Sequence, residues 1–168
     1  LNFDKSKSVV KPAELKDADI KALEAWMAKA QTNPKIAIKS VNMTGFASPE
    51  GEQGKNESLS TDRATAAKDA TKSIAKKAKN TKGQEEIYNL VGSGEDWEGF
   101  KAELQKSTMK EDEKQLVIRV LEMYKDPVQR ETEIRNMSKT FTFLEKSILP
   151  QLRRSEIKVV YDLTGYYD

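Results

Sequence analysis

The sequence contains no cysteine and no histidine among its 168 residues. Without cysteine, the chain cannot form a disulfide or use a thiol as a nucleophile. Without histidine, it cannot build a Ser-His-Asp triad, and it lacks the two side chains that hold most zinc ions in proteins. Disulfide-stapled folds, cysteine hydrolases, histidine-dependent hydrolases and nearly all zinc sites are therefore excluded.

Long apolar runs and concentrated basic charge are also lacking. No stretch approaches the roughly 20 apolar residues that a membrane-spanning helix needs. The 29 Lys and Arg residues are nearly balanced by 27 Asp and Glu residues, which gives a formal net charge of +2. No arginine-rich stripe with interleaved aromatic residues occurs, so nucleic acid is not an expected partner.

What is present indicates a polar, globular chain. Charged residues make up 33% of the sequence and hydrophobic residues 37%, and the apolar positions are too periodic for a disordered protein. The length favours a single domain over residues 1–168 that carries a large insertion. The chain opens at Leu1 without an initiator Met, so we expect a mature form or fragment whose signal or membrane anchor lies upstream.

Periodic apolar positions predict alternating strands and helices in the first half. A short strand is expected at residues 1–4, followed by an amphipathic helix over residues 12–31. A second strand is expected over residues 36–43, with a bulge at Ser40, where its alternation slips. This order favours a sheet packed against helices.

The next elements continue the same alternation. Ser60 is expected to be the N-cap of a helix that ends near Asn80. A third strand over residues 85–91 is expected to end at the Gly-Ser-Gly-Glu sequence of residues 92–95, and a final strand is expected at residues 156–162. The predicted fold class is α/β, a mixed βαβαβ-type sheet packed on helices in an α+β sandwich.

Residues 96–149 are expected to be helical throughout, as an insertion before the last strand. Thr108 and Glu111 match a capping box, and Asp126-Pro127 matches a helix start with proline at the first position. A last helix is expected from the apolar stripe of residues 134–148, and Pro150 is expected to end it. The insertion should therefore contain several helices.

The stretch from Gly45 to Ala64 carries the most specific motif in the chain. Seven positions at fixed spacing resemble the signature of the OmpA-like peptidoglycan-binding family, in which a strand ends in Gly-His-Thr-Asp and a helix begins at Leu-Ser-x-x-Arg-Ala. These positions are Gly45, Gly51, Asn56, Leu59, Ser60, Arg63 and Ala64. The resemblance implies a non-catalytic periplasmic domain of a Gram-negative outer-membrane protein. Such a domain tethers the outer membrane to peptidoglycan by binding diaminopimelate of the stem peptide.

The same resemblance implies roles for individual residues. Arg63 matches the arginine that takes a ligand carboxylate, and Asn56 is expected to shape the loop. Ser48 stands where the family has its aspartate, and Ala47 stands where it has threonine, so this Ser-Pro-Glu-Gly variant lacks the charged group that pairs with the ligand ammonium. Glu50 is a candidate for a displaced carboxylate in the same loop.

Two alternatives stay open at this point. Arg63 could instead pair with a local acid such as Asp62 or Glu57, and serve only the fold. A domain that has lost peptidoglycan binding could serve as a protein interaction module through its helical insertion, where Phe143 lies off the main apolar stripe.

Catalysis, metals and cofactors are not expected. Acid pairs such as Glu85-Glu86 and Glu95-Asp96 lie in lysine-rich segments, where acids are usually solvated partners of nearby bases. Ser48 is not in a Gly-x-Ser-x-Gly turn, and no Asp-x-Asp-x-Asp-Gly calcium loop occurs.

Overall fold

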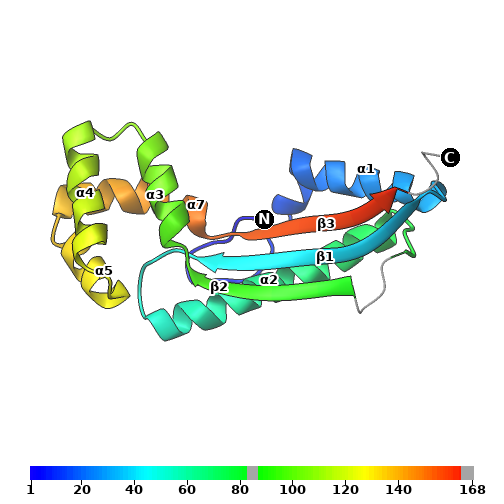
Figure 1. The fold of residues 1–168 in the computed structure, drawn as a ribbon, viewed down its shortest axis with the longest axis horizontal. Helices are drawn as coiled ribbons and strands as arrows, with labels where there is room; N and C mark the ends of the chain where they lie inside the picture. The colour runs from blue at the N-terminus through cyan, green and yellow to red at the C-terminus, as the bar shows by residue number, and fades with distance from the viewer. Residues whose placement is uncertain (83–86, 164–168) are drawn as a thin grey trace.

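The fold is a mixed three-stranded sheet with helices on one face and a separate helical lobe at one end (Figure 1). The computed structural model describes residues 1–82 and 87–163. The strands are β1 (Ile36–Ala47), β2 (Tyr88–Glu95) and β3 (Ser155–Leu163), in the order β2-β1-β3. β1 pairs with β2 in parallel and with β3 antiparallel. The predicted α/β fold class is confirmed.

Strand β1 is the central strand of the sheet. Its side chains alternate between the buried face and the half-buried face. From Val41 to Ala47 every second residue is buried and the residues between are half-buried, which is the period of a strand with one face on a core. Its register slips between Ile38 and Ser40, so the predicted bulge is confirmed. The strand runs beyond the predicted residue 43, since pairing with both neighbours continues to Ala47 or close to it.

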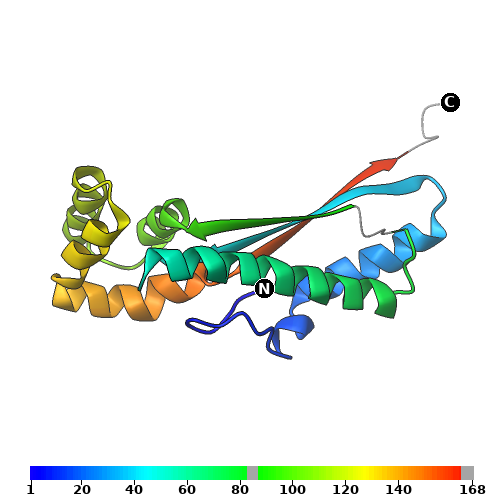
Figure 2. The same ribbon diagram turned by 90° about the horizontal axis from the view of Figure 1, so that it is seen from below.

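Two helices, α1 (Ala18–Thr32) and α2 (Gln53–Lys77), lie on the same side of this sheet (Figure 2). The core between the layers is formed by small and medium-sized side chains, which let α2 approach the strands closely. Its buried members include Ile20, Met27, Val41, Met43, Ala67 and Ile74. None of the described helices is long and apolar enough to cross a membrane.

The helical lobe follows β2 and has a core of its own. It contains α3 (Trp97–Lys106), α4 (Glu111–Met123), α5 (Pro127–Arg135), α6 (Ser138–Phe143), the π-helical turn η3 (Leu144–Ile148) and α7 (Leu149–Leu152). Its buried apolar residues include Phe100, Leu104, Val117, Leu121, Ile134, Leu144 and Ile148. The predicted helical insertion over residues 96–149 thus corresponds to a compact lobe. The predicted helix start at Asp126 is confirmed, because its side chain accepts a hydrogen bond from the amide of Val128.

Several predicted boundaries in the first half were wrong. The expected first strand is a single bridge between Asn2 and Arg154. The first helix begins at Ala18, because a 3-10 turn, η1 (Glu14–Lys16), precedes it. Helix α2 begins at Gln53, so Ser60 lies inside it rather than at its N-cap.

The later boundaries also needed correction. Residues 92–95 belong to strand β2 instead of ending it, whereas the predicted strand start at residues 85 and 86 lies outside the described residues. Thr108 forms no cap for α4, whose N-cap is Lys110, because the chain before the helix turns to bury Met109. Pro150 lies within α7, where it is tolerated because the wide π-helical turn before it needs no amide from the proline ring.

Candidate functional site

The turn after β1 buries a carboxylate and a hydroxyl together. Ser48 and Glu50 are 4% and 7% exposed, and the Ser48 hydroxyl donates to Glu50 Oε1 over 2.7 Å. Gly51 has a φ of +80°, a conformation that side chains rarely adopt, so a glycine suits this turn. The structure therefore brings Ser48 and Glu50 together, as the sequence suggested.

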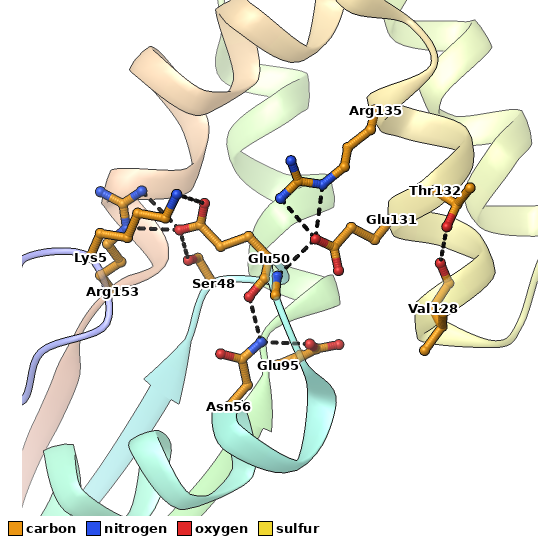
Figure 3. Close-up of polar contacts among 11 residues, drawn as sticks. Lys5, Ser48, Glu50, Asn56, Glu95, Val128, Glu131, Thr132, Arg135 and Arg153 are labelled. Carbon is orange, nitrogen blue, oxygen red and sulfur yellow. Dashed lines mark hydrogen bonds and ion pairs between the residues drawn. The ribbon is translucent and has the colours of Figure 1, made fainter.

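Glu50 is held from the far end of the chain by Arg153 (Figure 3). Arg153 donates to Oε1 of Glu50 from Nη2 over 2.9 Å and from Nε over 3.2 Å. The second oxygen, Oε2, is buried and accepts no hydrogen bond from the described part of the chain, although the ammonium of Lys5 lies 3.6 Å from it. We call Ser48, Glu50, Arg153 and Lys5 the Glu50 cluster. Arg153 and Lys5 were not identified from the sequence.

The environment of Glu50 favours its ionised form. Burial alone raises the pKa of Glu50, but the hydrogen bonds from Ser48 and Arg153, together with the charges of Arg153 and Lys5, outweigh burial and bring the pKa below its ordinary value. A carboxylate that is buried, ionised and bonded through one oxygen has capacity left on the other. This oxygen can accept a bond from a cationic group.

Stability is expected to depend on pH through this carboxylate. Because the folded-state pKa is depressed, the stabilisation is present above the unfolded-state value, near 4.5, and is lost as the pH falls through the folded value. We expect Glu50→Gln to reduce the free energy of unfolding at about pH 6, and this gap to be smaller at about pH 3. Urea unfolding at both pH values measures it. Glu52→Gln, in an exposed residue of the same turn, is the control, and a gap that stays constant with pH would contradict the assignment.

Arg63 lies in the interior of the domain. Its side chain is 0% exposed, and it donates to three backbone carbonyls: Phe46 over 2.8 Å, Lys7 over 3.0 Å and Asp4 over 3.2 Å. Burial, and secondarily the charge of Arg153, lowers the pKa of Arg63 to about 10, so the guanidinium stays charged at neutral pH.

The expected position of Arg63 at the start of a helix was wrong, because α2 begins at Gln53 and places Arg63 well inside it. The alternative partners were wrong too, since the described hydrogen bonds of Arg63 go to backbone carbonyls and not to Asp62 or Glu57. With no exposed surface, Arg63 does not meet a ligand directly in this conformation.

Asn56 connects the turn to the end of strand β2. Its amide nitrogen donates to the carbonyl of Glu50 over 2.8 Å and to Oε2 of Glu95 over 2.7 Å (Figure 3). Its expected role in shaping the loop agrees with these contacts. Glu95, which was not singled out as a site residue, also accepts from the indole of Trp97 over 3.3 Å. Burial, with the charges of Glu131 and Glu57, raises the pKa of Glu95 despite these hydrogen bonds.

Two further motif residues serve the scaffold. Ser60 is fully buried, and its hydroxyl donates to the Glu57 carbonyl and accepts from the Gly94 amide over 2.8 Å. This bond ties α2 to β2. Ala47 is also fully buried, and its carbonyl accepts the Asp96 amide. Ala47 therefore packs in the core next to the turn, and its side chain is not exposed to a ligand.

The helical lobe contacts the turn from the side opposite the strands. Oε1 of Glu131, in α5, accepts the amide of Gly51 over 2.8 Å and is itself held by Arg135 (Figure 3). Pro49 lines a crevice together with Trp97 and Ile134 of the lobe. The insertion thus helps to fix the conformation of the loop that carries Glu50.

An open groove of about 500 Å³ lies beside the turn. It runs between the N-terminal residues and the first turns of α2, with Ser6 on one side and Lys55 and Asn56 on the other. Asn56 therefore borders the groove and also bonds the backbone of Glu50. Among the described residues, no group of acidic side chains is arranged to hold a metal ion.

Comparison with known protein families finds none that matches this chain, and comparison with curated proteins finds no match either.

Proposed function

We propose that this chain is a non-catalytic domain that binds the peptide stem of peptidoglycan and tethers a bacterial outer membrane to the cell wall from the periplasm. The resemblance of residues 45–64 to the OmpA-like signature suggests this ligand class. The observation that carries the proposal is the second carboxylate oxygen of Glu50, Oε2, which is buried, has no hydrogen-bond partner among the described residues and lies 3.6 Å from the ammonium of Lys5, in a carboxyl group whose pKa is lowered.

Glu50 supplies the charge that Ser48 cannot. A hydroxyl can accept a bond from an ammonium but adds no charge, and hydrogen bonds to charged groups contribute about 1.5 to 3 kcal/mol each. In this chain the hydroxyl of Ser48 instead orients Glu50, so the two residues together take the place of one aspartate. The ammonium of diaminopimelate binds Glu50 Oε2, which Lys5 approaches in the free protein.

The ligand carboxylate requires a cation near the same place. Lys55, an exposed residue on the rim of the groove, lies close to the turn. Arg153 is largely buried, and its charge and hydrogen bonds lower the pKa of Glu50. Arg63, with no exposed surface, does not bind the ligand directly in this conformation.

Sedimentation with purified peptidoglycan sacculi tests this function. Glu50→Gln keeps an oxygen for Ser48 and Arg153 but removes the charge, so we expect affinity for sacculi to fall roughly tenfold or more. Glu122→Gln makes the same change at an exposed residue of α4, away from the turn and the groove, and should leave affinity nearly unchanged. A folded wild-type domain that does not bind above background, or a Glu50→Gln variant that binds normally, would refute the proposal.

The second candidate is a protein interaction module that uses the helical lobe. The expected exposed residue, Phe143, is half-buried and packs against the lobe core instead. The observation that favours this candidate is a different one: Leu116 and Met123, one face of α4, are 51% and 70% exposed. This function would be supported if the wild type does not bind sacculi but captures a protein partner, and if Leu116→Glu loses that partner.

A further inference from the structure

The N-terminal loop, residues 4–8, covers both charged groups of the candidate site. The carbonyls of Asp4 and Lys7 accept hydrogen bonds from the guanidinium of Arg63. Between them, Lys5 extends its ammonium to within 3.6 Å of Glu50 Oε2. One short segment therefore places oxygens on a buried cation and an ammonium on a buried anion.

The arrangement of charges in this loop matches that of a free amino acid end. A free amino acid end carries an ammonium beside a carboxylate, and the loop presents an ammonium beside carbonyl oxygens at matching partners. The side chain of Glu50 is 7% exposed, and its Oε2 has no hydrogen-bond partner among the residues that the structure describes. Lys5 at 3.6 Å fills this position only loosely, because a charge-assisted hydrogen bond is shorter, at about 2.7 to 2.9 Å.

The Lys5 side chain is the weakly held part of this loop. Residues 4–7 are exposed to solvent, and Ser6 has a φ of +60° in a turn closed by the Lys7 amide and the Asp4 carbonyl. The backbone of the loop is tied by its two hydrogen bonds from Arg63, whereas the described contact of the Lys5 side chain is an ion pair of 3.6 Å from a side chain that is more than half exposed, and such pairs contribute little. By contrast, the residue before the loop, Phe3, is buried and its amide donates to the Arg153 carbonyl. The Lys5 side chain can thus be displaced without disturbing Phe3 or the hydrogen bonds of Arg63.

We propose that the N-terminal loop is an internal stand-in for the ligand, with Lys5 as the group that the ligand ammonium displaces. This inference rests on the proposed function and names the part of the site that regulates it. When Lys5 occupies the site, only the fraction of molecules with Lys5 displaced is competent to bind, and the apparent affinity is reduced by that fraction. Lys5 therefore weakens binding, although it is a cation near an anionic polymer.

The test is a sacculus-binding titration with Lys5→Met, which keeps the aliphatic stem and removes the ammonium. We expect its affinity to rise about two- to fivefold, because the competing contact is lost. Lys16→Met is the matched control, since Lys16 is an exposed residue of the 3-10 turn η1 and its loss changes the net charge equally. If Lys5 acted only as a general cation, both variants would bind slightly more weakly than the wild type.

Combination with Glu50→Gln separates this inference from the proposed function. If Lys5 competes for Glu50, the gain from Lys5→Met disappears in the Glu50→Gln background. Wild-type binding that depends on Glu50 but is no tighter in Lys5→Met than in Lys16→Met would overturn the inference and leave the function standing. If the wild type and Lys5→Met are both folded and neither binds sacculi, both proposals fail.

Discussion

The Arg63→Met variant is expected to lose roughly 3 kcal/mol of unfolding free energy. Methionine is of similar length, but it removes the donors that satisfy the carbonyls of Phe46, Lys7 and Asp4. Those oxygens lie around a side chain that is 0% exposed, so water cannot replace the lost bonds without opening the structure. The substitution also removes a positive charge close to Glu50. Urea unfolding monitored by tryptophan fluorescence measures the change.

Arg119→Met is the matched control for this prediction. Arg119 is exposed on α4, and substitutions at such positions usually change stability by less than about 0.5 kcal/mol. Arg63→Lys should fall between the two, because lysine keeps the charge but cannot bond in three directions in one plane. If Arg63→Met were as stable as the wild type but failed to bind sacculi, Arg63 would be a ligand group and not the core residue described above.

The Gly45→Ala variant is expected to be destabilised by about 3 kcal/mol or more, a large fraction of the stability of a typical domain. A β-carbon at Gly45 would overlap the carbonyl oxygen of Ser60 and would lie 2.7 Å from the amide nitrogen of Ala64. Both atoms belong to the backbone of α2, so no side-chain rotation relieves the clash. The helix would have to move away from the central strand, and the core between them would open.

Gly54→Ala provides the control on the same helix. Gly54 lies near the start of α2, and a β-carbon there meets nothing within 4 Å. Alanine is the better helix former, so this variant should be unchanged or more stable by up to about 1 kcal/mol. Thermal unfolding of the two variants distinguishes them. A Gly45→Ala protein with wild-type stability would mean that α2 packs less closely on the sheet than its position here requires.

Local signals account for the elements that were predicted correctly. The bulge at Ser40 follows from a break in alternation along one strand. The start of α5 follows from Asp126-Pro127, where the side-chain cap and the fixed proline dihedral both act within one turn. Such features depend on neighbouring residues only, and the sequence therefore reveals them.

The start of α2 shows why other boundaries could not be read in the same way. The buried stripe of this helix continues before Ala64 through Arg63, Ser60 and Asn56, at the spacing of a helix face. These residues are polar, so a search for apolar periodicity ends too late. They are buried because the turn, the N-terminal loop and β2 supply their hydrogen-bond partners. Those partners lie elsewhere in the chain, so no local sequence pattern predicts them.

The residues of the candidate site also differ in whether their partners are close or distant in the sequence. Ser48, Glu50 and Asn56 were identified from the motif because they lie within a few residues of one another. Arg153 and Lys5 were missed, although they carry the charges that face Glu50, because they come from opposite ends of the chain. Glu131 was missed as a partner of the turn for the same reason, since it belongs to the helical lobe.

The sequence by itself determined the fold class, the helical character of the insertion and the place of the candidate loop. These follow from composition, periodicity and short motifs, which act over a few residues. Only the tertiary structure decided that Arg63 is a core residue, that Glu50 is a buried carboxylate and that the ammonium of Lys5 lies next to it. Burial and pairing determine what a charged group can do, and both are set by residues far away in the chain.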